Sequence, residues 1–251
     1  MSSAPSNLQG KRVLVTGGAG GVGRAVASRM VAAGATVLIA DREELELRCA
    51  VEAVRASVSN ARIDSVTADL ANSSGLARMF DRVDTWLGGL DILVACAGVG
   101  SGPLMDMSEP DWRYVIESNL VSYVACSQGA IERMRAAGIK HGIIILVGSI
   151  SVHIKAVGES VYNASKGGVA AFAETLRKEL IPHDIRITLV EPGAIDSAMQ
   201  PFSIEERARL VRESRLLPPE EVADAILFAA TRGPGVDVVT LRIEPLVQKI
   251  V

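Results

Sequence analysis

Glycine occupies five of the seven positions from 17 to 23, directly after an apolar, β-branched segment at 11–16. Apolar residues then recur every three or four positions, which is the pattern of a helix buried on one face. A strand that turns through glycines into a helix brings free backbone amides to one point, where a pyrophosphate can bind. The same sequence also suits a merely tight strand–helix turn. Taken by itself, the segment therefore leaves both interpretations open.

The remaining chain alternates short β-branched runs with longer helical patterns, which predicts an α/β fold with a parallel sheet and crossover helices. The predicted strands are residues 11–16, 36–40, 63–68, 91–97, 143–148, 185–190 and 237–243. The predicted helices are residues 22–33, 43–57, 73–87 with Ser73 or Ser74 as cap, 111–137, 159–181, 204–215 and 219–231. We expect a flexible tail at 1–10 and a single domain at 11–251, with a substrate loop at about 194–219.

Composition narrows the range of partners. A formal net charge of -3 leaves no basic surplus for nucleic acid or for an anionic membrane surface. Cys49, Cys96 and Cys126 are widely spaced and form no Cys-x-x-Cys, which argues against a disulfide framework and against zinc. The first residues do not resemble an export signal, and no apolar run is long enough to span a bilayer. We therefore expect a protein of the cytoplasm without a metal.

Asp41 stands at the end of the second predicted strand, 18 residues after Gly23. An acidic side chain there can accept hydrogen bonds from the adenosine ribose of a dinucleotide. Its charge would repel a 2′-phosphate, which favours NAD over NADP. The guanidinium of Arg42 could instead hold that phosphate, so NADP remains possible. A plain helix-capping aspartate is the other interpretation of Asp41.

Tyr162 and Lys166 are four residues apart in a predicted helix and so share one face. A free tyrosine has a pKa of about 10, and its use as an acid or base near neutrality needs a shift of about three units. A neighbouring cation can supply part of that shift. A lone Tyr-x-x-x-Lys is more often an ordinary surface pair, so the rest of the chain must decide.

Several motifs stand together in one order along the chain. They are the turn at 16–23, Asp69-Leu70, Ala97-Gly98, Asn119, Ser149, Tyr162-x-x-x-Lys166 and Pro192-Gly193. In this combination the chain resembles the short-chain dehydrogenases/reductases of about 250 residues, from residue 11 to about 232. The resemblance implies a Rossmann-like, doubly wound parallel sheet with the active site at the carboxyl ends of its strands.

The resemblance also implies roles for individual residues. Tyr162 would be the catalytic acid and base, and Lys166 would lower the tyrosine pKa and bind the nicotinamide ribose. Ser149 would bind the substrate oxygen, with Ser151 as the alternative. Asn119 would interrupt its helix locally and help to hold a water that leads to Lys166.

Further residues are implied for the cofactor and the substrate. The cofactor site would comprise Gly17, Gly21, Val22, Gly23, Asp41, Arg42, Asp69, Leu70, Ala97, Gly98, Pro192, Gly193 and Ile195, together with Tyr162 and Lys166. The substrate would meet His153, Glu159, Met199 and Phe202. Relatives pair their subunits through the two long helices, so we expect a homodimer or a homotetramer.

The expected function is an NAD(P)-dependent oxidoreductase, with NAD preferred, that interconverts a small secondary alcohol and its carbonyl compound. Two departures from the family pattern motivate an alternative. Ala95 and Cys96 stand where relatives have two asparagines, and Glu191 precedes Pro192 where asparagine is common. A dinucleotide-binding sensor or scaffold without turnover is therefore the second hypothesis.

Overall fold

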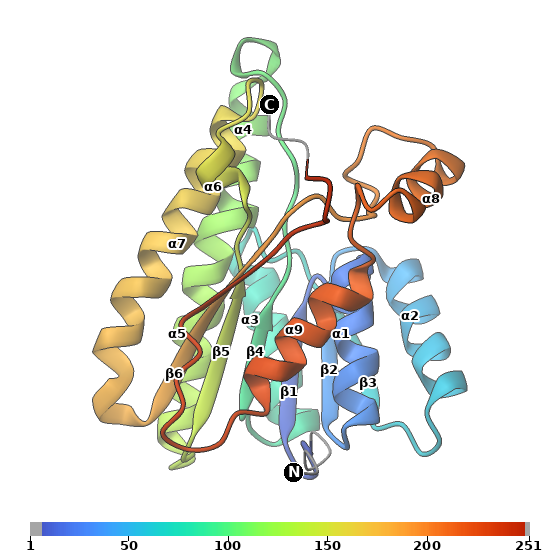
Figure 1. The fold of residues 1–251 in the computed structure, drawn as a ribbon. Helices are drawn as coiled ribbons and strands as arrows, with labels where there is room; N and C mark the ends of the chain where they lie inside the picture. Colours follow the sequence, from blue (N-terminus) through green and yellow to red (C-terminus); the bar gives the residue numbers. More distant parts are fainter. Residues whose placement is uncertain (1–6, 249–251) are drawn as a thin grey trace.

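One parallel sheet of seven strands forms the centre of the fold in the computed structural model, which describes residues 7–248 (Figure 1). The strand order is β3-β2-β1-β4-β5-β6-β7. The strands are β1 (Arg12–Thr16), β2 (Thr36–Asp41), β3 (Ile63–Thr67), β4 (Ile92–Ala95), β5 (Gly142–Val147), β6 (Ile185–Pro192) and β7 (Thr240–Ile243). The strand order reverses between β1 and β4. From β1 the chain continues toward one edge of the sheet, and from the neighbouring β4 it continues toward the other edge. The expected α/β fold with seven parallel strands is confirmed.

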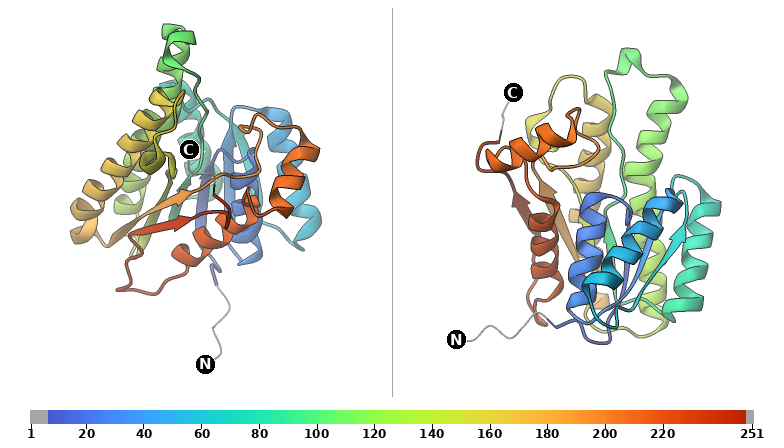
Figure 2. Two further views of the ribbon diagram at one scale, coloured as in Figure 1. Left: turned by 45° about the horizontal axis from the view of Figure 1, so that its top comes forward. Right: turned by 90° about the vertical axis from the view of Figure 1, so that its right-hand side faces the viewer.

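Helices cover both faces of the sheet (Figure 2). One face carries α1 (Gly21–Ala32), α2 (Glu44–Ser57) and α9 (Pro219–Ala230). The other face carries α3 (Ser73–Arg82), α5 (Ser122–Ala136) and α7 (Ser160–Leu180). Three further helices lie at the end of the molecule to which the strands run: α4 (Glu109–Ile116), α6 (Ser151–Ile154) and α8 (Ile204–Arg212) (Figure 1).

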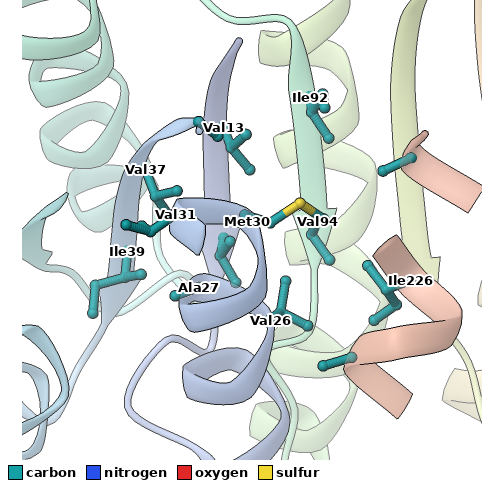
Figure 3. Packing of buried hydrophobic residues seen from close by; sticks show 14 of the residues in the cluster. Val13, Val26, Ala27, Met30, Val31, Val37, Ile39, Ile92, Val94 and Ile226 are labelled. Atoms are coloured by element: carbon teal, nitrogen blue, oxygen red, sulfur yellow. The ribbon is translucent and has the colours of Figure 1, made fainter. Parts of the chain in front are cut away.

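The first core layer lies between the sheet and α1. Val26 and Met30 recur four residues apart on the helix, and both side chains are fully buried. They pack with Val13 of β1 and Val94 of β4, as Figure 3 shows, while Ile226 of α9 closes the layer from the side. The central strands β4 and β5 carry no polar side chain because both faces of the sheet are covered there, and every residue of both strands is buried.

Two local predictions were wrong. The cap of α3 is Asn72, whose side chain accepts a hydrogen bond from Gly75 N; neither Ser73 nor Ser74 takes that place. The last strand, expected from residue 237, begins only at Thr240. The long helix expected over 111–137 is present as α4 and α5, with a π-helical turn at Glu117–Val121 where an interruption at Asn119 is expected.

The expected flexible tail falls partly outside the described residues, since residues 1–6 are not described. Its described part is ordered. Leu8 is 3% exposed within the core, and its amide donates to the Ala33 carbonyl at 2.8 Å. The burial of one leucine therefore fixes the entry to β1, which composition alone did not indicate.

Met30→Ala tests the layer between α1 and the sheet. Truncation of a fully buried methionine removes apolar contacts and leaves a cavity, so we expect the free energy of unfolding to fall by about 2–5 kcal/mol. Urea denaturation gives the value. Leu45→Ala on α2 is the matched control, because Leu45 is 71% exposed and should change stability by less than about 0.5 kcal/mol. Equal losses in the two variants would contradict this packing.

Candidate active site

A cavity of about 380 Å³ runs along the carboxyl ends of the strands and spans the point where the strand order reverses. In doubly wound sheets this crevice is where ligands bind. Its walls come from the glycine turn after β1, the ends of β2 to β6, and residues of α4 and α7. Its volume is in the range of small-molecule and cofactor sites.

The glycine turn builds one wall of the cavity with backbone alone. Gly17 has φ +69°, and a Cβ there would lie 2.7 Å from Ala97 N, so only glycine fits between β1 and β4. A Cβ at Gly23 would collide with the Gly17 carbonyl oxygen. The first amides of α1 have no acceptor within the helix, and they face the cavity from Gly21 onward. This is a cradle for a pyrophosphate.

Asp41 lies at the end of β2, beside that cradle. Its Oδ2 accepts a hydrogen bond from Ala19 N at 3.1 Å, and its Oδ1 accepts one from Arg42 N at 2.7 Å. The carboxylate is thus fixed by backbone amides at the cavity wall. Arg42 turns toward α4, where Nη1 donates to the Tyr114 hydroxyl at 2.5 Å. That hydroxyl in turn lies 3.4 Å from Asp69 Oδ1, so it bridges the two charged groups.

The departure at Ala95 and Cys96 is compensated from the neighbouring strand. The hydroxyl oxygen of Thr16, a fully buried residue, accepts hydrogen bonds from Cys96 N at 3.2 Å and from Ala97 N at 3.3 Å. A β1 side chain therefore holds the backbone at the end of β4, and the loop after it stays in place without the missing amides.

Ser149, Tyr162 and Lys166 meet at the other end of the cavity and all line it. Ser149 follows β5, and its Oγ accepts a hydrogen bond from Ser151 N at 3.1 Å. Tyr162 and Lys166 lie one turn apart on α7, with Lys166 Nζ 6.0 Å from the centre of the Tyr162 ring. Ser151 does not line the cavity, so of the two serines the geometry favours Ser149.

Burial dominates the acid–base properties of this group. It raises the pKa of Tyr162, a shift that a hydrogen bond with Ser149 opposes and the negative charge of Glu159 reinforces. Burial also lowers the pKa of Lys166 to about 8. For Tyr162, desolvation of the phenolate outweighs the hydrogen bond with Ser149. The lowering of the tyrosine pKa by Lys166 stays a prediction.

Asn119 lies in the π-helical turn and is fully buried. Its Oδ1 accepts from Val99 N and its Nδ2 donates to Val99 O, both at 2.8 Å, as a neighbouring strand would. Nδ2 also lies 3.3 Å from Ser165 Oγ on α7. The expected interruption of the helix is present, and it aims the amide at the loop after β4. The water that Asn119 is expected to hold stays a prediction.

Pro192, Gly193 and Ile195 line the cavity where β6 ends. Gly193 is packed from outside by the C-terminal segment, since a Cβ there would lie 2.8 Å from Pro245 Cδ. The side-chain oxygen of Gln248 accepts a hydrogen bond from Ala194 N at 3.1 Å. The segment after β7 therefore returns over the end of β6 and supports this wall.

All residues predicted to bind the cofactor line the same cavity, and so does Met199 among those predicted for the substrate. His153, Glu159 and Phe202 do not line it. His153 instead pairs with Glu191, at 3.0 Å between Nε2 and Oε2. Glu191, 5% exposed, likewise does not line the cavity, so its carboxylate turns away from it.

Two tyrosines near the site were not predicted. Tyr114 lines the cavity from α4, and Tyr123 contacts Lys166 from α5. Tyr114 lies five residues before Asn119 and Tyr123 four residues after it. Their spacing of about one helical turn from Asn119 was the one signal in the sequence that could have pointed to them. Among the described residues, no group of three His, Cys, Asp or Glu side chains could hold a metal ion. No described helix is long and apolar enough to cross a membrane.

Comparisons with known proteins agree with this geometry. The sequence model of the family described as short chain dehydrogenase matches residues 11–208. The 3-oxoacyl-(acyl-carrier-protein) reductase FabG of Aquifex aeolicus is 31% identical, over 88% of this chain and 90% of the relative. The (3R)-3-hydroxyacyl-CoA dehydrogenase of Canis lupus familiaris is 32% identical, over 93% and 94%. A solved variant of actinorhodin polyketide ketoreductase with NADPH has a TM-score of 0.83 at 26% identity, over 94% and 96%.

The fold and the site thus define an oxidoreductase of the dinucleotide-binding class that acts on alcohol or keto groups. More narrowly, the chain belongs to the short-chain dehydrogenase/reductase family. The expected family is confirmed.

The buried ammonium of Lys166 predicts a pH-dependent stability. Its pKa is about 8 in the folded chain against 10.5 for an ordinary lysine, so between these values the unfolded chain holds more protons. Stability from this group therefore rises as the pH rises through that window. Lys166→Met should be more stable than the native protein at pH 7, and the difference should shrink by about 1–2 kcal/mol by pH 9.5.

Urea denaturation at several pH values measures this difference. Other titrating groups are shared by both proteins and cancel. Lys140→Met is the control, because Lys140 is exposed and the same substitution there removes a charge from the surface and not from the interior. Parallel stability curves for native protein and Lys166→Met would contradict the depressed pKa.

Proposed function

We propose that this chain interconverts a secondary alcohol and its carbonyl compound with NAD(H) in preference to NADP(H). One observation carries the proposal: a single cavity joins the glycine cradle and Asp41 at one end to Ser149, Tyr162 and Lys166 at the other. The cradle fits a dinucleotide, because the glycines leave open the space that side chains would fill. The named relatives are themselves a reductase, a dehydrogenase and a ketoreductase.

In this mechanism the nicotinamide supplies or accepts the hydride at the substrate carbon. The Ser149 hydroxyl donates a hydrogen bond to the substrate oxygen and fixes its position. In reduction the Tyr162 phenol gives its proton to that oxygen, and in oxidation the phenolate removes the proton from the alcohol. The Lys166 ammonium lies beside the phenol and favours the phenolate, against the desolvation that raises the tyrosine pKa.

The preference for NAD rests on Asp41. Its carboxylate is held at the cavity wall by the amides of Ala19 and Arg42, so it is placed to accept hydrogen bonds from ribose hydroxyls and to repel a 2′-phosphate. Arg42 is the group that could bind that phosphate, and its guanidinium is engaged by the Tyr114 hydroxyl. The ketoreductase relative was solved with NADPH, so the test must include both cofactors.

The substrate is proposed to be small and free of negative charge. Met199 gives the cavity an apolar wall, and Phe202 is half-exposed on the same loop. Glu159 lies near enough to raise the pKa of Tyr162, so an anionic group would meet repulsion there. The loop region 194–219 with α8 could close over such a substrate and exclude water. His153 remains a proposed contact at the outer edge.

The quaternary state and the compartment are also proposals. Val121 and Val124 are half-exposed apolar side chains at the junction of the π-helical turn and α5, which supports pairing of two chains to a homodimer or homotetramer. Residues 11–251 are proposed to act as one domain. The three cysteines are unpaired, as a reducing cytoplasmic location would require.

The alternative of a sensor or scaffold without turnover has lost both of its motives. Thr16 supplies the hydrogen bonds at Cys96 and Ala97, and Glu191 points to His153 and not into the cavity. A pure binding protein has no physical need for a phenol beside a buried ammonium.

Tyr162→Phe tests the assigned acid and base. A panel of alcohols and ketones, followed by the absorbance of reduced nicotinamide, identifies a substrate with the native protein. Since the variant lacks only the ionisable hydroxyl, kcat should fall by about 10²–10⁴ while cofactor Kd changes little. Ser151→Ala is the control and should retain activity, because Ser151 does not line the cavity. Equal turnover by native protein and Tyr162→Phe would refute the mechanism.

Asp41→Asn tests the cofactor preference. Loss of the charge should raise the affinity for NADPH relative to NADH by about tenfold or more, measured by quenching of protein fluorescence. Glu46→Gln is the matched control, since it removes the same charge from the same cavity without altering the end of β2. It should change the ratio by less than about threefold. Tighter binding of NADPH than NADH by the native protein would overturn the argument from Asp41.

A further inference from the structure

Lys166 is held by a buried tyrosine that the family motif does not include. Its Nζ donates to the Tyr123 hydroxyl at 3.2 Å and to the Val147 carbonyl at 3.0 Å. The Tyr123 hydroxyl also donates to the Val147 carbonyl, at 3.1 Å. The three polar atoms form a closed triangle, with one corner each from α7, α5 and β5.

The triangle fixes the direction in which the ammonium acts. The only proton of the Tyr123 hydroxyl goes to Val147, so a lone pair of its oxygen is left to face Lys166. Because the three separations are nearly equal, both acceptors lie on one side of Nζ. In the part of the chain that the structure describes, these two are the acceptors of the ammonium. Its third N–H therefore points away from them. Lys166 lines the cavity, and its Nζ lies 3.6 Å from the position of a Cβ on Gly98, another residue of the cavity wall.

Tyr123 is suited to hold a charge and unsuited to carry a proton. It is 1% exposed, and burial raises its pKa well above the ordinary value, so it stays a neutral phenol. The ring face also attracts the ammonium, with Nζ 4.8 Å from the ring centre. Its hydroxyl proton is donated to the Val147 carbonyl oxygen, which has no proton of its own to donate further. The hydroxyl is thus an anchor and no part of a proton relay.

We propose that Tyr123 is a positioning residue that aims the Lys166 ammonium into the cavity, where it meets the cofactor ribose and Tyr162. The proposal deepens the proposed function and rests on the role given there to Lys166. The titratable groups that face the ammonium are Tyr123 on α5, Tyr162 on α7 and the Cys96 thiol after β4. Burial raises the pKa of Cys96 to about 12, so it brings no charge of its own near neutrality.

Tyr123→Phe keeps the ring and removes the oxygen, so it separates anchoring from packing. Loss of the acceptor destabilises the ammonium, and the pKa of Lys166 should therefore fall by at least half a unit. Carbon-13 labelling of the lysine ε-carbons and an NMR titration of the cofactor-free protein measure this, and Lys166→Met assigns the signal. With NADH as probe, Kd should rise about threefold or more, and kcat should fall about tenfold.

Ser122→Ala is the matched control. It removes a buried hydroxyl and its hydrogen bond to Ser118 O from the neighbouring position of α5, with no contact to Lys166. Ser122→Ala should leave the pKa of Lys166 unchanged and keep kcat within about twofold of the native value. If Tyr123→Phe does not fold, Tyr123→Met lacks the same oxygen and takes its place in each measurement.

The outcomes separate this inference from the proposed function. The inference would be overturned if Tyr123→Phe kept the native pKa of Lys166, the native Kd for NADH and the native kcat, while Lys166→Met lost NADH affinity and turnover. If Lys166→Met itself turned over and bound NADH normally, the proposed role of Lys166 would fail first. A drop in kcat shared equally by Ser122→Ala would mean that α5 acts through general packing, and the inference would be rejected.

Discussion

A positive charge buried among apolar elements is the constraint around which one half of the cavity is organised. Transfer of an ammonium out of water is strongly unfavourable unless acceptors surround it. Lys166 is 4% exposed, and the acceptors come from a helix and a strand that pack against α7. Gly98 leaves room on the cavity side, where a Cβ would lie 3.6 Å from Nζ. The carboxyl ends of β4 and β5 are therefore shaped to keep one side chain charged.

Backbone irregularity does much of the positioning. The π-helical turn at Glu117–Val121 carries one residue more per turn than an α-helix, which rotates α5 relative to α4. Asn119 on this turn can then pair with both backbone groups of Val99, while Tyr123, one turn later, reaches Lys166. Because both contacts depend on the same turn, the loop after β4 and the catalytic lysine are set by one local distortion.

The alternation of apolar runs was sufficient to predict all seven strands, because a sheet covered on both faces leaves an unmistakable apolar run in each buried strand. Strand ends were less accurate, most of all in β7, where the edge position removes that signal. Most of the cavity lining could also be located from local motifs, since the glycines, Asp41 and Asp69 all stand at or just after the ends of strands.

Other features of the site were beyond the sequence because distant elements create them. Thr16 accepts hydrogen bonds from the backbone amides of Cys96 and Ala97 only because β1 and β4 are neighbours. Glu191 finds His153 only because a four-residue helix, α6, follows β5. Tyr123 follows the π-helical turn, and the expected interruption at Asn119 did not indicate in which direction the helix after it would point. In each case the sequence around the residue shows no distinctive pattern, and its contact with a residue distant in the sequence determines what it does.

The return of the chain after β7 has a practical consequence for handling the protein. Pro245 and Gln248 pack on Gly193 and Ala194, so the described C-terminal residues form part of the wall behind the nicotinamide end. Leu8 lies at the other end of the sheet, since its carbonyl accepts a hydrogen bond from Lys11 N just before β1 begins. A substitution at Pro245 or Gln248 would therefore disturb the wall of the site that an activity assay reports on. A substitution at Leu8 would act on the opposite end of β1.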